Sequence, residues 1–540
     1  MSGALAGTGH LIRFILRRDR VRMSVWAASM TAFITYFSVA LSTVFDASAL
    51  AARAQVMRTP AGIVMGGPGY GADHYTPMVA VANEGTLWLV AALSLMAILH
   101  MVRHSRAEEE SGRAELVRAG AIGRLAPAAA ALTTLALHLA VITALCALAT
   151  FAAPEERSLP DALALTGGSA LVALVFGAVA LVTGQLAATG RGALGLSLAA
   201  LGLAIAVRAA GDMIRPEGSA LSWFSPIAWA QQMRAYVDLR WWPILLAPAL
   251  GLLLVLAADA LAARRDLGQG LLAARPGPAR APRGLRGPLA LAWRQQRGVL
   301  AWCAVGMGLM WFATGTLMSM LEDMAADLVA GNAALGALFG TDPTAMSSAF
   351  LSVMMLFVAL CAAVYGIVAA QGSPRGEESA GTLELTLAGP VGRSRWLGAQ
   401  LVLALGGSLG LLALSVAALW LGTVAVGLEE PSLADHAGVL VTQAPPTLVF
   451  GALAAALYGW APRWAGLSWL LVAATFVTGM FGVLLDLPEW ALGISPFHWA
   501  AAPYTEDPAA GGSLAMAAVV VVLLVLAQLG FRRRAVVTGA

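Results

Sequence analysis

The sequence predicts an all-α polytopic membrane protein of about twelve transmembrane helices, built as two tandem repeats of six. Three observations predict it: an apolar composition, a series of long apolar runs and an internal duplication. Of the 540 residues, 59% are hydrophobic and only 12% are charged, with a mean hydropathy of +0.77. Soluble domains carry about 25% charged residues. A chain of this composition therefore needs lipid as part of its solvent.

Runs of about 20 mostly apolar residues mark the candidate transmembrane helices. The predicted spans are residues 23–45, 85–104, 125–152, 162–187, 193–211, 241–262, 298–320, 349–370, 396–427, 435–460, 464–486 and 512–531. With the N-terminus inside, most arginines fall on the inner side. The exceptions are Arg53, Arg58, Arg157, Arg208, Arg215, Arg234 and Arg240. The positive-inside rule then places both termini in the cytoplasm.

The chain repeats itself at about half its length. Arg106-Ala-Glu-Glu-Glu-Ser-Gly-Arg-Ala-Glu-Leu-Val-Arg-Ala-Gly-Ala-Ile-Gly-Arg124 corresponds to Arg375-Gly-Glu-Glu-Ser-Ala-Gly-Thr-Leu-Glu-Leu-Thr-Leu-Ala-Gly-Pro-Val-Gly-Arg393. The separation between Arg124 and Arg393 defines the repeat offset. Six spans per copy is an even number, so both copies insert the same way up. We expect a pseudo-twofold axis along the membrane normal rather than an inverted repeat.

The duplication divides the chain into two six-helix units joined by a tether. The first unit covers residues 1–262 and the second covers 289–540, with a cytoplasmic linker rich in Pro, Gly and Arg at 263–288. Before its first span each unit has a basic, partly apolar stretch, 10–22 or 289–297, that suits either an interfacial elbow helix or a plain basic flank. Each also has an outer segment before its last span, 212–240 or 487–511.

Residues 106–124 and 375–393, here called the acidic segments, lie between the second and third spans of each unit. Each begins with clustered carboxylates and continues as a short amphipathic helix, in which Leu383 and Leu387 share a face. One such helix per half suits docking to a twofold-symmetric partner. An ordinary interfacial loop, whose glutamates pair with nearby arginines, also fits the pattern.

The acidic segment of the second copy, from Glu377-Glu378 through Gly381-Thr-Leu-Glu-Leu to Arg393, resembles the cytoplasmic signature of ABC-2-type permeases. The first copy is similar to the actinobacterial polyketide-antibiotic exporter branch, in which two six-span units are fused. The resemblance implies that these segments are coupling helices that contact an ATPase. The implied contact residues are Glu108, Glu109, Gly112, Glu115, Glu377, Glu378, Gly381 and Glu384. Arg113-Ala114 replaces Thr382-Leu383 in copy one, so the resemblance does not imply equal use of both sites.

The resemblance implies an exporter permease that moves hydrophobic or amphipathic compounds, such as antibiotics, out of the cell. A Walker A loop requires lysine, and the sequence contains none. We therefore expect no cofactor and no enzymatic activity in this chain. ATP and Mg²⁺ would bind a separate cytosolic ABC ATPase, expected as a homodimer. Two parallel six-span halves also describe proton-coupled secondary multidrug transporters, although their Gly-x-x-x-Asp-Arg-x-Gly-Arg type signature is absent.

The outer segments are rich in aromatic residues. Pro226 and Trp229 recur as Pro496 and Trp499 in the second copy, and Trp223 precedes them in the first. Aromatic residues at a membrane boundary usually anchor the protein, and the family resemblance implies an outer gate as the alternative. Inside the spans, polar residues such as His100, Gln185 and Asp259 are functional candidates, although packing explains a lone histidine more often. The scattered histidines predict no metal site, and a net charge of +3 does not suggest nucleic-acid binding.

Overall fold

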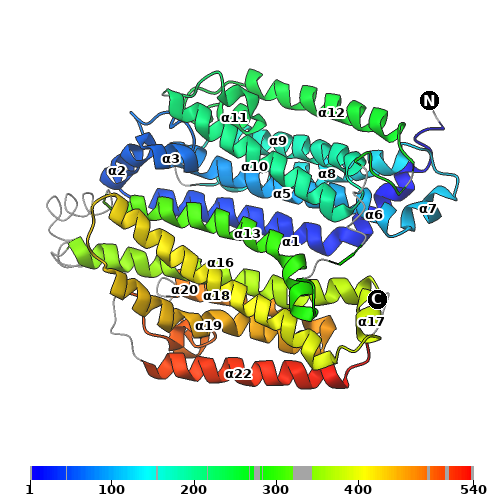
Figure 1. Ribbon diagram of the computed structural model, residues 1–540. Helices are drawn as coiled ribbons and strands as arrows, with labels where there is room; N and C mark the ends of the chain where they lie inside the picture. The colour runs from blue at the N-terminus through cyan, green and yellow to red at the C-terminus, as the bar shows by residue number, and fades with distance from the viewer. Residues whose placement is uncertain are drawn as a thin grey trace. The chain divides into compact units, whose positions relative to one another are not determined.

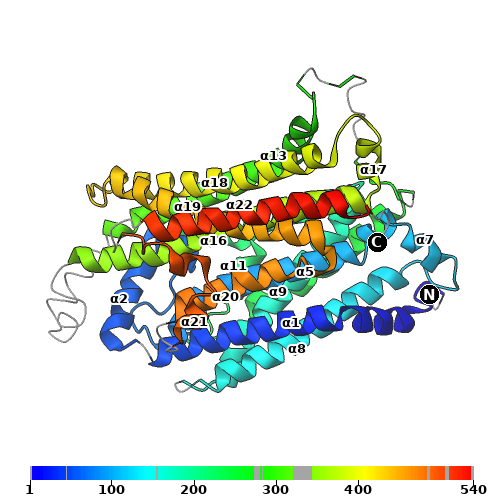
Figure 2. The ribbon, with the colours of Figure 1, turned by 90° about the horizontal axis from the view of Figure 1, so that it is seen from below.

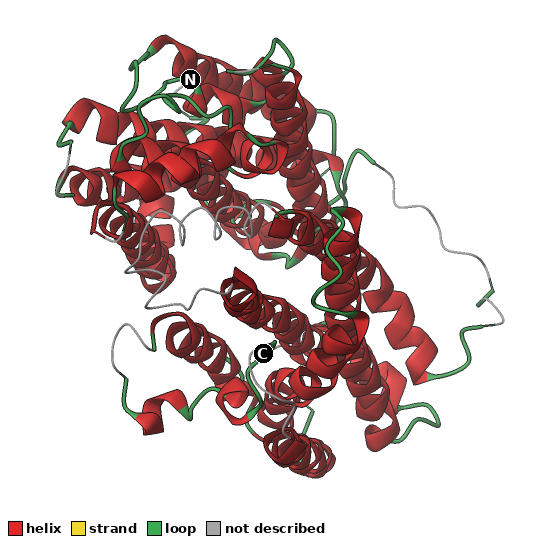
Figure 3. Cartoon of the chain, turned by 90° about the vertical axis from the view of Figure 1, so that its left-hand side faces the viewer, coloured by secondary structure: helices red, strands yellow, loops and turns green. Residues whose placement is uncertain are grey.

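The computed structural model describes residues 3–43, 45–153, 156–215, 217–266, 268–272, 280–281, 284–319, 343–482, 487–504 and 510–536. Within these ranges the secondary structure is helical and contains no strand (Figure 1, Figure 3). The chain forms two compact units, Met1–Gly277 and Pro278–Ala540. Their boundary falls inside the predicted linker at 263–288.

The first unit is organised around one buried helix. Its long helices are α1 (Thr8–Thr43), α5 (Thr86–Arg103), α8 (Ala126–Phe151), α9 (Leu159–Leu186), α10 (Gly190–Ile214) and α12 (Leu246–Ala262). The short elements α2 (Ala47–Arg58), α3 (Pro60–Met65), α4 (Pro77–Ala80) and the π-helix η1 (Val81–Gly85) connect α1 to α5. Helix α9 packs against α5, α8, α10 and α12, while α1 runs along α8 (Figure 2).

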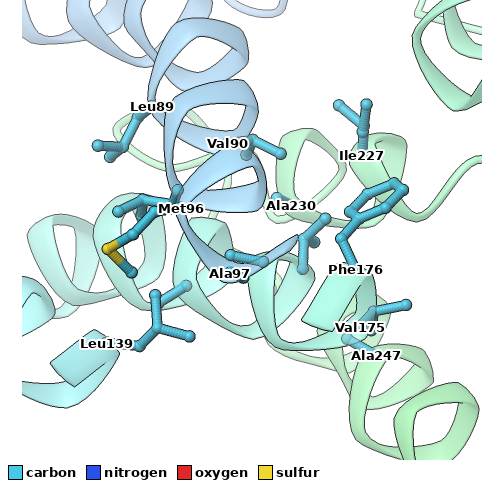
Figure 4. Close-up of a cluster of buried hydrophobic side chains, with 14 of the residues drawn as sticks. Leu89, Val90, Met96, Ala97, Leu139, Val175, Phe176, Ile227, Ala230 and Ala247 are labelled. Atoms are coloured by element: carbon cyan, nitrogen blue, oxygen red, sulfur yellow. The ribbon is translucent and has the colours of Figure 1, made fainter. Parts of the chain in front are cut away.

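Small residues on α9 allow this close packing. In lipid, helices associate mainly through van der Waals contact, so small residues collect where backbones approach. A methyl group added at Gly177 would lie 2.6 Å from the Leu135 side chain of α8. The same methyl group would lie 3.7 Å from the Ala97 side chain of α5, and the neighbouring Val175 lies beside Ala247 of α12 (Figure 4). The core therefore lies on α9.

The second unit repeats the order of long helices. They are α13 (Pro288–Thr316), α16 (Pro343–Ser379), α18 (Arg393–Ala425), α19 (Leu433–Trp460), α20 (Leu467–Phe481) and α22 (Ala510–Arg533). Helix α13 packs along α18 at a contact between Gly315 and Gly422. A side chain at either glycine would overlap a backbone carbonyl of the other helix, that of Leu419 or Phe312.

The prediction of about twelve spans is confirmed. Eleven of the described helices are long and apolar enough to cross a membrane. The predicted span 464–486 corresponds to α20, a 15-residue helix, and residues 483–486 lie outside the described ranges. The stretches 10–22 and 289–297 are the first turns of α1 and α13 rather than separate helices. Neither stretch contains a proline or glycine that would break the helix.

The glycine contact between α13 and α18 generates a stability prediction. We expect Gly315→Ala to lower the free energy of unfolding by about 1–3 kcal/mol, because the added methyl group forces the backbones apart. Thermal unfolding of the detergent-solubilised protein measures this. The matched control is Gly306→Ala on the same helix, where a methyl group meets nothing within 4 Å. Equal melting temperatures for the two variants would contradict the packing described here.

Candidate functional site

Each acidic segment turns sharply at a glycine. In the first unit, α6 (Arg106–Glu110) is followed by Gly112 at φ +74° and then by α7 (Arg113–Arg118). In the second unit, α16 is followed by Gly381 at φ +72° and then by α17 (Thr382–Leu387). A methyl group on either glycine would meet no atom within 4 Å. The backbone conformation, and not lack of space, therefore requires glycine at both positions.

The first glutamate of each segment is bound to the first long helix of its own unit. Glu108 accepts from Arg18 Nη1 of α1 at 2.6 Å and from Arg113 Nε at 2.8 Å. Its counterpart Glu377 is buried.

Neutral donors hold Glu377. They are Gln295 Nε2 of α13 at 2.8 Å, Trp396 Nε1 at 3.1 Å and Gln400 Nε2 at 3.3 Å. The glutamate has the same position in both acidic segments, but charged arginine donors bind it in the first unit and neutral donors bind it in the second.

The second glutamate of each segment pairs with an arginine just beyond the sixth long helix. Both oxygens of Glu109 accept from Arg265 at 2.8 Å, and both oxygens of Glu378 accept from Arg534 at 2.8 and 2.9 Å. Two-pronged pairs of this kind are strong and directional. Arg265 and Arg534 are separated by the repeat offset, like the glutamates. Sequence reasoning missed this pair, although the repeat offset marks it.

The arginine that opens each segment binds the connection that follows the fourth long helix. Arg106 is buried and donates from Nε to the Ala188 carbonyl at 3.1 Å. Arg375 donates to the Pro462 carbonyl. The acidic segment of each unit is thus connected to the first helix, to the connection after the fourth and to the end of the sixth.

The segments also present matched side chains outward. Leu116 of α7 and Leu385 of α17 are 78% and 77% exposed, and they too are separated by the repeat offset. Each follows an exposed glutamate, Glu115 or Glu384. Leu383 points inward and is fully buried. The structure therefore separates the predicted contact residues: Glu109, Glu377 and Glu378 face the unit's interior, whereas Glu115 and Glu384 lie on the surface.

The outer segments share one hydrogen-bonding pattern. Trp229 of α11 (Pro226–Gln231) donates from Nε1 to the Trp223 carbonyl at 2.9 Å. Trp499, in the short helix Pro496–Trp499, donates in the same way to the Gly493 carbonyl at 3.0 Å. Trp229 is buried, whereas Trp499 is 55% exposed. Pro226 and Pro496 begin the two short helices.

One group of potential metal ligands occurs among the described residues. Ligand atoms of Asp19, His100 and His104 lie within 4.8 Å of one another. His104 Nε2 is 2.6 Å from Asp19 Oδ2, and Arg103 Nη2 is 3.3 Å from Asp19 Oδ1. The group thus links α1 to the end of α5. At the repeat offset His100 and His104 correspond to Ala369 and Ser373, which are not metal ligands of this kind, so the group is not duplicated in the second unit.

The comparisons with known proteins agree on one family. A family model described as Multidrug efflux system permease Rv1217c, C-terminal domain, matches residues 285–532. The Multidrug efflux system permease protein Rv1217c of Mycobacterium tuberculosis (strain ATCC 25618 / H37Rv) is 34% identical over 536 residues, which cover 98% of this chain and 95% of that protein. With its series of apolar helices, the protein is a bacterial multi-pass membrane permease. The chain belongs to the family of the multidrug efflux system permease Rv1217c.

Proposed function

We propose that the chain is the permease subunit of an ABC-2-type exporter with two fused units. It moves hydrophobic or amphipathic compounds out of the cell with energy from a separate cytosolic ABC ATPase, which binds as a homodimer. The observation that carries the proposal is the pair of acidic segments. Each presents a leucine and a glutamate outward, Leu116 and Glu115 or Leu385 and Glu384, and each is bound behind to three other parts of its unit.

The contacts behind each segment provide a route for mechanical work. A displacement of α17 acts directly on Glu378, whose partner Arg534 follows α22. A displacement of the same segment acts through Glu377 on Gln295 of α13. Movement of an ATPase that binds α17 is therefore transmitted to the first and to the last long helix of the second unit, α13 and α22. The equivalent contacts in the first unit are Glu109 with Arg265 and Glu108 with Arg18.

The proposal is tested by co-purification with the partner ATPase and by drug-stimulated ATP hydrolysis in proteoliposomes. We expect a stable complex and an export activity that requires ATP. Export by the chain alone, driven by a proton gradient, would instead identify a secondary transporter. Because Mg²⁺ and ATP bind to the ATPase and not to the permease in this proposal, chelation of Mg²⁺ should stop export without unfolding the permease.

We predict that Glu384→Arg abolishes ATP-dependent export while the protein still folds and inserts. Replacement of an exposed carboxylate on α17 by a guanidinium reverses the charge at the proposed ATPase contact, and a mismatch of charge across an interface costs several kcal/mol. The control is Glu429→Arg, an exposed glutamate in the connection between α18 and α19. Transport assays in vesicles compare the two variants. Normal export by Glu384→Arg would contradict the docking surface.

The exposed leucines provide a second test, and it compares the two units. Loss of a buried leucine from an interface costs about 1.5–3 kcal/mol, so Leu385→Asp should weaken ATPase binding about tenfold or more. Leu116→Asp should do the same if both segments are used, and the double variant should not bind. The affinity of the ATPase for each permease variant, immobilised on a sensor surface, measures this effect. Leu433→Asp, at another exposed leucine, should bind normally.

The buried pair between Glu378 and Arg534 provides a third test. Arg534→Glu leaves two carboxylates together and should uncouple ATP hydrolysis from export or destabilise the second unit, because loss of one partner of a buried pair costs about 3–5 kcal/mol. The exchange Glu378→Arg with Arg534→Glu should restore a large part of both properties. Export and melting temperature are measured for each variant. An exchange no better than the single variant would show that the pair does not connect α22 to the segment.

A further inference from the structure

In the second unit, three aromatic rings fill the space behind the acidic segment. Phe531 stacks with Trp396 at 5.2 Å and with Tyr458 at 5.8 Å between ring centroids. None of the three is more than 1% exposed. Tyr458 also donates to Glu378 at 3.0 Å, and the guanidinium of Arg534 lies over its ring. The aromatic stack thus packs directly against the pair that holds the segment.

In the first unit, the same places carry small or polar residues. Pro127 and Ala262 precede Trp396 and Phe531 by the repeat offset. Gln185 Oε1 accepts from Arg265 Nε at 2.6 Å. It thus contacts the arginine of the first unit as Tyr458 contacts Arg534 in the second. The Glu109–Arg265 pair is retained, so the surrounding framework is the same. The first unit lacks the three aromatic rings at these places. A cavity of about 400 Å³, lined by Pro127, Gln185 and Ala262 among others, lies there instead.

The walls of this cavity are apolar and come from several elements. They include Phe14 and Ile15 of α1, Val117 of α7, Leu132 of α8 and Val255 of α12. Pockets for drug-sized ligands are mostly apolar with a few polar groups, and they measure about 300–1,000 Å³. The cavity therefore has the size and the lining of a small-molecule site rather than of a packing defect.

Charged groups line the cavity as well, and their pairing leaves an excess of positive charge. Its three carboxylates are all engaged by arginines that also line it: Glu108 by Arg18, Glu109 by Arg265 and Asp259 by Arg124. The fourth arginine of the lining is Arg118, in the last turn of α7. Among the described residues, no ion pair involves its guanidinium. An anionic group is the complement of such a lining.

We propose that this cavity of the first unit binds a drug-sized anionic amphiphile, with its apolar body against α1, α8 and α12 and its carboxylate at Arg118. Among the described residues of the second unit, the aromatic stack occupies the equivalent space. Since Val117 and Arg118 belong to α7, a bound ligand contacts the helix that carries the exposed Leu116. The site goes beyond the proposed function and does not depend on it, because binding is measured on the chain without any ATPase.

The experiment introduces into the first unit the phenylalanine that the second unit has at the corresponding position, Phe531. The probe is a dansyl-labelled medium-chain carboxylate, whose fluorescence rises in an apolar site, titrated onto the full chain in detergent. We expect saturable binding that Ala262→Phe weakens at least about tenfold, because the new ring occupies the cavity. The matched control is Ala260→Phe, two residues away on the same helix and outside the lining. Equal binding by the two variants would overturn the proposal, and thermal unfolding verifies that both are folded.

A second comparison tests the charge. Arg118→Gln should weaken binding of the carboxylate about tenfold, because hydrogen bonds to charged groups are worth about 1.5–3 kcal/mol. The same variant should bind the matched dansyl alcohol as the unsubstituted protein does. Equal losses for the carboxylate and the alcohol would overturn the assignment of an anionic ligand. Displacement of the probe by phosphatidylglycerol, but not by phosphatidylcholine, would also overturn it and assign the cavity to a lipid headgroup.

Discussion

A carboxylate that is largely buried among helix ends needs a positively charged partner, and this requirement connects the helices of each unit. Glu109 and Glu378 keep only 12% and 10% of their side-chain surface exposed. An ionised group in such a place is stabilised only when a partner and further hydrogen bonds compensate for lost water. Arg265 and Arg534 provide that compensation from beyond the sixth helix. The segment, the sixth helix and the first helix are therefore held as one assembly.

The two units use this framework differently. The first unit is rich in charge behind the segment: Arg18 and Arg113 hold Glu108, and Asp19 binds His104. At the equivalent place in the second unit, Gln295 interacts with Glu377 and with Ser373. Neutral amide and indole donors replace arginine there. The first unit thus combines a charged interior that contains a cavity with the shared outer arrangement, while the second unit holds Glu377 with neutral donors and fills the equivalent space with aromatic rings.

The transmembrane helices and the duplication were predictable because both depend on long, regular features of the sequence. Apolar runs of about 20 residues leave few alternatives in lipid, and an offset shared by many positions is hard to produce by chance. The exposed leucines were not predictable in the same way. In α17, the spacing of Leu383 and Leu387 defines one face of the helix, but only the packing of the unit shows that Leu383 points inward and Leu385 outward.

Arg265 and Arg534 were overlooked for a related reason. Each stands in a cluster of arginines at the end of an apolar run, where a basic flank already explains its presence. Its pairing with a glutamate 156 residues away depends on tertiary structure. The repeat offset was a usable signal, because the arginines and the glutamates keep the same spacing. The cavity behind α7 left a weaker signal, because the small residues Pro127 and Ala262 acquire meaning only once the structure shows that Trp396 and Phe531 stack at the corresponding positions.

The glycine contact between α13 and α18 limits how the second unit rearranges. Where Gly315 meets Gly422, backbone lies directly on backbone, and no flexible side chain separates the two helices. Sliding of one helix past the other would drive the next side chain into a carbonyl group. We therefore expect the two helices to move together at this contact. Any relative motion within the unit has to be taken up elsewhere along them or in the helices around them.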